Sequence, residues 1–373
     1  MDSRITVTKI PPSDLPVPPL GLLRRAGQLW LEDPEAEYLS LGLALRGQIE
    51  GILPEGWSWK GRRVLDFGCG AGKVLRHFAP EANEGEFWGC DIHAESIEWI
   101  QANMCPPFRA FRCQEKAGLP QPDGYFDLVF ALSVYTHITD HWAEWLLEHH
   151  RVLANDGLLL VTFLGEGMVQ VLTGEQWCED HIGMNVLREG NPWELGGPTT
   201  LLSPWWLRAH WGRAFEIVDL WPYMSVEPRR PTAHEPPMGQ GMILLRRKPV
   251  RLKVEDLTRL EPNEPREILA LEHNLRQLRD EAAELRRSHA QLADQVKPTH
   301  KQLGQPLAEM GDLQRELRAR DQKLRQAEED LLAHRAWLDG IQASASWRLT
   351  APARALKRRL TSDRRSGRDI KTR

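Results

Sequence analysis

The chain has 373 residues, of which 41% are hydrophobic and 27% are charged, and its formal net charge at pH 7 is −4. This length provides one large domain with additional segments, and no apolar run approaches the roughly 18 residues of a membrane span. Residues 347–373 carry ten Lys or Arg and two Asp, a charge of +8, so the rest of the chain carries −12. An acidic body excludes general nucleic-acid binding, which needs a basic surface on the folded domain.

The cysteines indicate a reducing compartment. Their number is odd, and no two have the C-x-x-C spacing of a metal or redox motif, so neither disulfides nor a metal site are predicted. The amino terminus also lacks the basic-then-apolar pattern of a signal peptide, so we expect a cytoplasmic protein. The five cysteines are Cys69, Cys90, Cys105, Cys113 and Cys178.

The first 60 residues are expected to form an arm and cap helices. Residues 1 to about 20 contain Pro11-Pro12 and Pro18-Pro19, which favour an extended arm. Residues 21–60 contain leucines in a helical pattern. We expect these helices to cap either the ligand pocket or the edge of the sheet.

Residues 64–72, Val-Leu-Asp-Phe-Gly-Cys-Gly-Ala-Gly, predict a strand that runs through an acid into a tight turn. A helical pattern follows from Lys73 to Phe78. Glycine adopts positive φ without steric penalty and lets the backbone approach a ligand closely. The G-x-G-x-G spacing differs from the G-x-G-x-x-G of dinucleotide-binding folds. The alternative is a structural turn that binds no ligand.

Three further strands are predicted after this turn. Residues 87–92 end a strand at Asp91, which is placed to bind ribose hydroxyls. Residues 125–131 and 152–163 each contain an apolar run typical of a fully buried strand. Apolar strands that alternate with helical segments predict an α/β protein with a parallel sheet covered on both faces.

These pieces resemble the class I S-adenosylmethionine-dependent methyltransferases over roughly residues 60–165. The matching strings are VLDFGCGAG, GCDIHAESIEWI, FDLVFALSVYTHI and VLANDGLLLVTF. The resemblance implies a Rossmann-like, seven-stranded methyltransferase sheet with helices on both faces, and S-adenosyl-L-methionine as cofactor. We expect this domain to span residues 61–248 and to end in an antiparallel hairpin at 215–220 and 241–247.

The resemblance also implies which residues hold the methionyl and ribose parts of the cofactor. Gly68, Cys69 and Gly70 would lie under the methionyl part, with Gly72 in the same loop. Asp66 would lie near the cofactor's amino group, and Asp91 would bind the ribose hydroxyls. For Cys69, the alternative is a small turn residue without chemistry.

The remaining cofactor residues would surround the adenine and the reacting centre. Ile92 would pack on the adenine, and Cys113 and Gln114 would lie at its edge. The family often has Asp or Asn near position 113, and this chain departs from that pattern. Ala131 and Leu132, at the end of the fourth strand, would line the cofactor.

An aromatic insertion is expected at about residues 165–214. Loops at the carboxyl ends of parallel strands form the ligand crevice, and indole faces suit flat sugar or ring substrates. We therefore interpret the cluster as an acceptor site, with ordinary packing as the alternative for each indole. The tryptophans are Trp177, Trp193, Trp205, Trp206, Trp211 and Trp221.

His137 is the candidate catalytic base. It ends the string Tyr135-Thr136-His137, which directly follows the fourth strand, and members of the resembled family carry an aromatic-Ser/Thr-His string there. A hydroxyl acceptor needs its proton removed, and histidine titrates near neutral pH. The alternative is a structural His137 bonded to a backbone carbonyl. His149 and His150 are expected on the surface of the next helix.

Residues 249–343 predict a coiled coil with a break at 298–306. Apolar residues recur at alternating steps of three and four in a first block, and at steps of seven in a second. We expect the first block to join two or more chains into a homo-oligomer; the alternative is a helix folded against the body. The first block comprises Ile268, Leu271, Leu275, Leu278, Ala282, Leu285, His289, Leu292 and Val296, and the second Met310, Leu317, Leu324, Leu331 and Leu338.

Residues 344–373 form a basic amphipathic tail. Its string SASWRLTAPARALKRRL resembles a short segment at the carboxyl termini of bacterial polysaccharide-assembly proteins, often glycosyltransferases. The tail is expected to contact either the inner face of the membrane or a glycosyltransferase; the alternative is a solvated tail.

Together these features predict an O-methyltransferase for a sugar or glycan-linked acceptor in surface polysaccharide biosynthesis. Two alternatives stay open. One is a methyltransferase for another small molecule or a lipid, dimerised by its coiled coil. The other is a non-catalytic scaffold with a methyltransferase fold.

Overall fold

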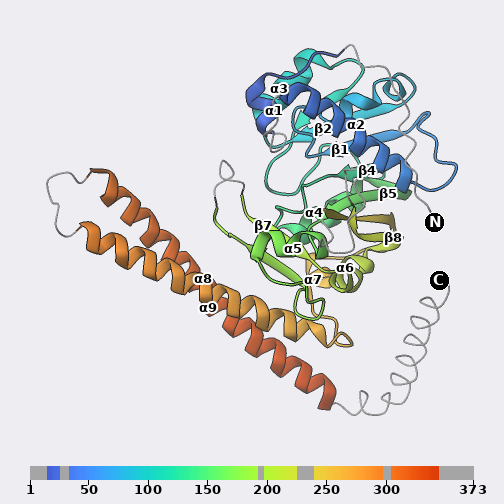
Figure 1. Cartoon of the computed structure of the whole chain (residues 1–373). Helices are drawn as coiled ribbons and strands as arrows, with labels where there is room; N and C mark the ends of the chain where they lie inside the picture. Colours follow the sequence, from blue (N-terminus) through green and yellow to red (C-terminus); the bar gives the residue numbers. More distant parts are fainter. Residues whose placement is uncertain (1–14, 26–32, 192–196, 225–238, 297–303, 344–373) are drawn as a thin grey trace, which may run out of the picture. The chain divides into compact units, whose positions relative to one another are not determined.

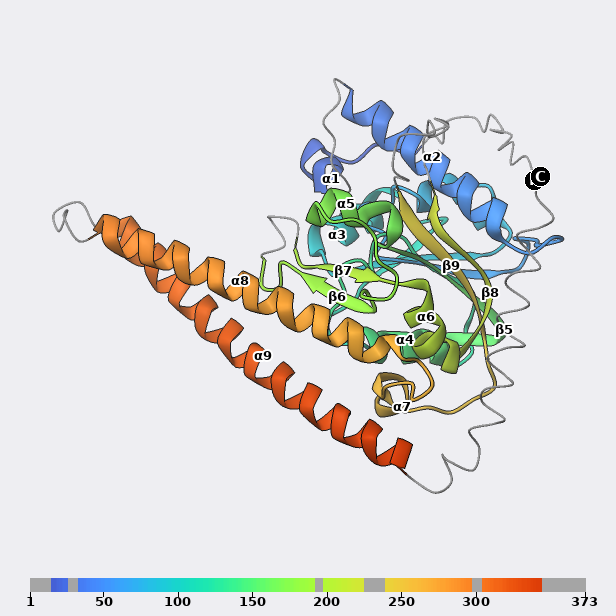
Figure 2. The same cartoon turned by 60° about the horizontal axis from the view of Figure 1, so that its bottom comes forward.

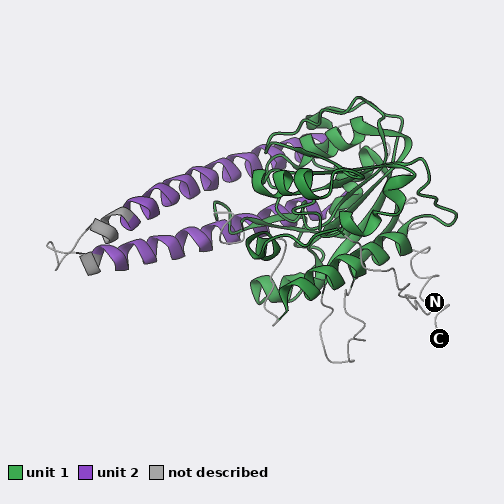
Figure 3. Ribbon diagram, turned by 90° about the horizontal axis from the view of Figure 1, so that it is seen from above, with its two compact units in different colours: residues 1–261 green, residues 262–373 purple. Residues whose placement is uncertain are grey.

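The computed structural model of the chain describes residues 15–25, 33–191, 197–224, 239–296 and 304–343. The chain divides into two compact units, residues 1–261 and 262–373 (Figure 3). The first unit extends beyond residue 248, where the methyltransferase domain was expected to end. It includes the short helix α7 (Val254–Thr258), which is hydrogen-bonded to earlier residues of the same unit. Nδ1 of His210 lies 2.6 Å from the carbonyl oxygen of Leu257, within this unit.

The first unit is built on a seven-stranded sheet with the order β3-β2-β1-β4-β5-β9-β8 (Figures 1 and 2). The first five strands in this order are parallel, and β9 runs antiparallel between β5 and β8. The predicted seven-stranded sheet and its closing hairpin are therefore confirmed. The strands are β1 (Arg63–Phe67), β2 (Glu86–Asp91), β3 (Arg109–Arg112), β4 (Phe126–Ala131), β5 (Leu153–Phe163), β8 (Phe215–Met224) and β9 (Gln240–Arg247).

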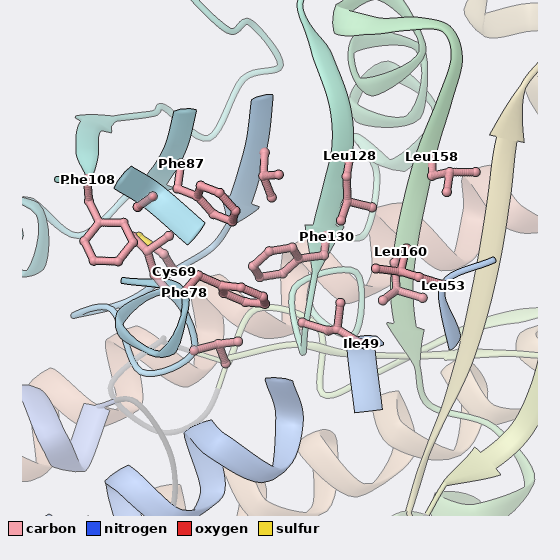
Figure 4. Close-up of a cluster of buried hydrophobic side chains, with 14 of the residues drawn as sticks. Ile49, Leu53, Cys69, Phe78, Phe87, Phe108, Leu128, Phe130, Leu158 and Leu160 are labelled. Carbon is pink, nitrogen blue, oxygen red and sulfur yellow. The ribbon is translucent and has the colours of Figure 1, made fainter. Parts of the chain in front are cut away.

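The two faces of the sheet are covered by different helices because side chains alternate along a strand. On one face, α2 (Pro34–Ile52) and α3 (Ala94–Asn103) share a hydrophobic core with the strands (Figure 4). On the other face, Phe67 packs against Trp145 of α4 (Trp142–Val152), with ring centroids 4.7 Å apart. The first core includes Ile49, Leu53, Phe78, Phe87, Phe108, Leu128, Phe130, Leu158 and Leu160.

The region after β5 forms a small substructure of its own. Its two strands pair antiparallel, and a second hydrophobic cluster forms around Leu164, Val169 and Leu201. The remaining elements of the first unit are α1 (Leu20–Arg25), η1 (Leu75–Phe78), η2 (Glu81–Asn83), α5 (Glu166–Thr173), β6 (Met184–Leu187), β7 (Thr199–Leu202), α6 (Pro204–His210) and η4 (Trp211–Arg213).

The second unit is a helical hairpin of α8 (Arg266–Val296) and α9 (Gly304–Ala343). Three ion pairs show that the helices run antiparallel: Glu272 with Arg335, Arg279 with Glu328, and Arg286 with Asp321. Successive partners are seven residues apart on both helices. The two blocks thus pair with each other within one chain, while association of copies through them stays a prediction.

The predicted apolar positions face the inside of this hairpin. From Leu271 to Leu292 in α8, and from Met310 to Leu338 in α9, every one of them is buried or half-buried. Most of the residues between them are exposed, as expected for two amphipathic helices. Among the residues that the structure describes, no helix has both the length and the apolar character needed to cross a membrane.

His149 and His150 of α4 are buried, so the prediction that they lie on the helix surface was wrong. His149 is fully buried, and its Nδ1 lies 2.9 Å from the hydroxyl of Tyr135. His150 bonds through Nε2 to the carbonyl oxygen of Lys248 at 2.8 Å. Later segments of the first unit, such as the one that contains Lys248, cover the side of α4 that the sequence pattern assigned to solvent. The apolar pattern of α4 alone could not show this contact.

The hairpin predicts a crosslink within one chain. In a Cys178→Ser background, Arg279→Cys with Glu328→Cys should react with a short bismaleimide to give mainly a monomer carrying the linker, measured by denaturing gel and mass spectrometry. Arg279→Cys with Asp312→Cys is the control, since it places the second thiol about four turns away. A covalent dimer as the main product would show that α8 pairs between chains instead.

His149 predicts a loss of stability in acid. Burial lowers its pKa to about 3, so below pH 6.5 the unfolded chain takes up a proton that the folded chain excludes. The free energy of unfolding should therefore fall by about 1.4 kcal/mol per pH unit between pH 6.5 and 3 from this group alone. Denaturant unfolding at several pH values should show a shallower pH dependence for His149→Gln. The exposed His141→Gln is the control, and equal slopes for His149→Gln and the native chain would contradict the prediction.

Candidate functional site

The turn after β1 has a backbone that requires glycine. Gly68, Gly70 and Gly72 all have positive φ, at 78°, 53° and 82°. The amides of Gly68 and Cys69 donate to the carbonyl oxygen of Cys90 at 2.8 and 3.0 Å. The loop therefore lies across the carboxyl end of β2, at the edge of the sheet where ligands of open α/β folds bind.

The loop that leaves β4 touches this turn. A Cβ atom at Gly68 would stand 2.2 Å from Cγ2 of Val134, so a side chain there would clash as well as strain the backbone. The neighbouring Ser133 also has a positive φ of 57°, and its amide donates to Oγ1 of Thr162 at 2.7 Å. The sequence had singled out neither Val134 nor Ser133, because a contact between two loops leaves no local pattern.

Asp91 lies at the centre of this arrangement. One of its carboxylate oxygens accepts from the amide of Gly70 at 2.9 Å, and the other accepts from the amide of His93 at 2.8 Å. Each carboxylate oxygen can accept a second bond, and the side chain is half-buried. Asp91 can thus hold the glycine turn in place and still accept from ribose hydroxyls.

Asp66 is buried beneath the same turn. It is 4% exposed, and its Oδ2 atom has no hydrogen-bond partner among the described residues. Burial, and then the charge of Asp91, raise the pKa of the Asp66 carboxyl, whereas Lys73 lowers it. An unsatisfied buried acceptor is costly, and a cationic amino group of a ligand would satisfy it.

The predicted adenine side lies at the ends of β2 and β3. Ile92 is 39% exposed, which is unusual for a large apolar residue beside a sheet edge and suits the face of a base. Cys113 is buried, and its amide donates to the carbonyl oxygen of Asp91 at 3.0 Å. Gln114 is exposed next to it. These three residues directly follow β2 and β3, which pair side by side, and their role as an adenine site stays a prediction.

Ala131 and Leu132 complete the set of predicted cofactor residues. Ala131 is fully buried at the end of β4, and Leu132 is half-buried in the loop that follows. Burial raises the pKa of the Cys69 thiol, which keeps the thiol protonated and favours the reading of Cys69 as a small turn residue without chemistry. The chain thus offers a glycine turn, two acids and an apolar edge, which together fit S-adenosylmethionine.

His137 lies in the same loop after β4. Its Nδ1 is 2.7 Å from the carbonyl oxygen of Pro198. A carbonyl only accepts, so Nδ1 carries the proton and, in the neutral ring, Nε2 carries the lone pair. The bond to a backbone carbonyl was foreseen as the mark of a structural histidine, but it also orients the ring and fixes the tautomer that a base needs.

The tryptophans of the insertion mostly pack in the interior. Trp205 is 3% exposed, and its Nε1 donates to the carbonyl oxygen of Glu179 at 2.6 Å. Trp206 stacks on His210, and Trp211 packs against Tyr135. Trp177 and Trp221 are half-buried against the two hydrophobic clusters, and Trp193 lies outside the described residues. The indoles therefore give little support to an aromatic acceptor site.

Comparison with known proteins places the site in a recognisable segment. Residues 64–157 match the family model described as a methyltransferase domain. The ubiquinone biosynthesis O-methyltransferase of Bordetella avium (strain 197N) is 28% identical over 120 residues, which cover 31% of this chain and 47% of that protein. The chain thus matches about half the length of this curated relative.

Solved methyltransferase structures are also similar. A SAM-dependent methyltransferase from Methanosarcina mazei shares 17% identity at a TM-score of 0.36, covering 54% of this chain and 97% of that one. A TehB-like SAM-dependent methyltransferase from Corynebacterium glutamicum shares 17% identity at a TM-score of 0.34, covering 56% and 88%. From the family match, residues 64–157 are a methyltransferase domain, and its cofactor is S-adenosylmethionine.

Proposed function

We propose that the chain transfers a methyl group to a hydroxyl oxygen, with His137 as the base, and that the acceptor is a sugar or a glycan-linked compound. One observation carries the catalytic part: the bond from Nδ1 of His137 to Pro198 leaves Nε2 as the basic nitrogen. The same loop reaches the glycine turn through Val134, so the base and the cofactor residues belong to one edge of the sheet.

The chemistry asks little of the protein beyond alignment and proton removal. When bound, S-adenosylmethionine supplies a methyl group already activated by its sulfonium. The glycine turn and Asp91 hold the cofactor, the loop after β4 brings an acceptor alongside, and Nε2 of His137 takes the hydroxyl proton. Alignment and general-base catalysis are the two contributions that this chain's residues can make.

The acceptor class rests on the carboxyl-terminal string. The segment SASWRLTAPARALKRRL resembles tails of bacterial polysaccharide-assembly proteins, which favours a glycan. A small-molecule acceptor is the second candidate, favoured by the ubiquinone O-methyltransferase relative. A non-catalytic scaffold is disfavoured because the glycine turn, Asp66 and Asp91 are all in place.

The proposal predicts that the purified protein transfers labelled methyl groups from S-adenosylmethionine to surface glycans taken from cells that lack the protein. His137→Ala should lower the turnover by about 10²–10⁴-fold and leave cofactor affinity unchanged, because only proton removal is lost. Product mass spectrometry and calorimetry measure the two effects, and added imidazole should restore part of the turnover.

His141→Ala is the matched control, because it removes an exposed histidine four residues further along the chain. This variant should keep full turnover. Full turnover in His137→Ala would make that histidine structural. Methylation of hydroxylated ubiquinone precursors, with no methylation of the glycans, would replace the sugar acceptor by the small-molecule one.

We further propose that the tail, residues 344–373, places the enzyme at an assembly site. The tail lies outside the described residues, so its charge and sequence carry this step. Each basic group near an anionic leaflet contributes about 1 kcal/mol, and two copies would bind more firmly than one. Association of copies stays a prediction, and it would now join hairpins rather than single helices.

Full-length protein should therefore pellet with anionic vesicles, and less so as salt is raised. Deletion of residues 344–373 should abolish pelleting without changing cofactor affinity. Neutral vesicles are the control. If pelleting is absent, or indifferent to lipid charge and salt, the tail contacts a protein such as a glycosyltransferase instead of lipid.

A further inference from the structure

Helix α2 lies directly on the glycine turn. The hydroxyl of Tyr38 donates to the carbonyl oxygen of Ala71 at 3.0 Å, and both residues are buried. One turn further along, a Cβ atom at Gly42 would stand 2.1 Å from the carbonyl oxygen of Lys73. Helix α2 therefore contacts the turn on both sides of Gly72, through the side chain of Tyr38 at Ala71 and through its backbone at Gly42, more closely than a general cap over the pocket requires.

The amino-terminal segment is fastened to the same place. Nη2 of the buried Arg76 donates to the carbonyl oxygens of Leu15 and Pro16 at 2.6 and 3.0 Å. The Arg76 guanidinium also lies over the ring of Tyr38, 5.9 Å from its centroid. Helix α2 is thus held beside the turn by two contacts of Tyr38, one with Ala71 in the turn and one with Arg76 in η1.

This placement brings a second carboxylate to the turn. Glu37 precedes Tyr38 in the first turn of α2, and its Oε2 atom is buried with no hydrogen-bond partner among the described residues. Oδ2 of Asp66 is in the same condition. Glu37 and Asp66 are also the two carboxylates whose charges act on Lys73, where both oppose the effect of burial on its pKa.

Two carboxylates therefore share one lysine beside the turn that holds the methionyl end of the cofactor. Each of the two carboxylates keeps a buried oxygen atom that has no hydrogen-bond partner among the described residues, and a cationic donor would satisfy both atoms. The α-ammonium of S-adenosylmethionine is such a donor, and its three N–H groups could donate to both carboxylates.

We propose that Glu37 is a second carboxylate, together with Asp66, for the α-ammonium of the cofactor. Helix α2 is then a wall of the cofactor site, and its contacts at Tyr38 and Gly42 set the distance of that wall from the glycine turn. This inference rests on S-adenosylmethionine being the cofactor, which one arm of the experiment tests by itself.

Two ligands separate this role from a structural one. S-Adenosylhomocysteine carries the α-ammonium, whereas 5′-methylthioadenosine has the same nucleoside and lacks the amino-acid end. Glu37→Gln should weaken S-adenosylhomocysteine about tenfold or more, the size of a lost charge-assisted hydrogen bond, and leave 5′-methylthioadenosine unchanged. Calorimetry on the full-length chain measures both affinities.

Glu35→Gln is the matched control, because it removes the same charge from the first turn of α2 at an exposed position; it should change neither affinity. Asp91→Asn should weaken both ligands, since both carry the ribose. If Glu37→Gln unfolds α2, Glu37→Asp replaces it in the experiment. Glu37→Asp should also weaken S-adenosylhomocysteine and not 5′-methylthioadenosine, but by a smaller factor. Equal losses for both ligands, or no loss for S-adenosylhomocysteine, would overturn the role of Glu37.

Failure of the native chain to bind either ligand would overturn the cofactor assignment, and Glu37 with it. Native affinity for both ligands, with an unselective Glu37 variant, would overturn the role of Glu37 alone.

Discussion

The attachment of the glycine turn to β2 is the constraint on which the candidate site depends. The carboxylate of Asp91 accepts from the amides of Gly70 in the turn and of His93, two residues after Asp91. The carbonyl oxygen of Cys90 accepts from two further amides of the turn. With that turn fixed, Val134 can lie against Gly68, and α2 can approach at Gly42. Three segments far apart in sequence are therefore all positioned against one short stretch of backbone.

The sheet was predictable because its strands carry strong local signals. Buried parallel strands are nearly continuous apolar runs, and in this chain each such run is followed by a turn or an acid. The acids Asp66 and Asp91 could likewise be placed at strand ends from spacing alone. The docking of α2 could not, since a helical pattern around Tyr38 and Gly42 says which side is apolar but not which segment lies against it.

A local pattern does not show which distant segment packs against a helix. For this reason the sequence placed His149 and His150 on the surface of α4 and could not tell packing tryptophans from an acceptor site. An α4 helix with one apolar side predicts one covered side, but His150 is bonded to Lys248, 98 residues later. An indole is equally suited to a sugar face and to a protein core, so composition could not decide for Trp205 and Trp206. His137 was chosen as the candidate base from its place after β4, whereas its tautomer depends on a bond to Pro198, 61 residues away.

The ion pairs of the C-terminal hairpin have a consequence for how such chains can change in length. Because the partners on α8 and α9 recur every seven residues, an insertion of three or four residues in one helix would turn its charges away from their partners. A heptad added to both helices would restore every pair. The hairpin can therefore lengthen or shorten with its ion pairs intact only in steps of one heptad, which is about 10 Å.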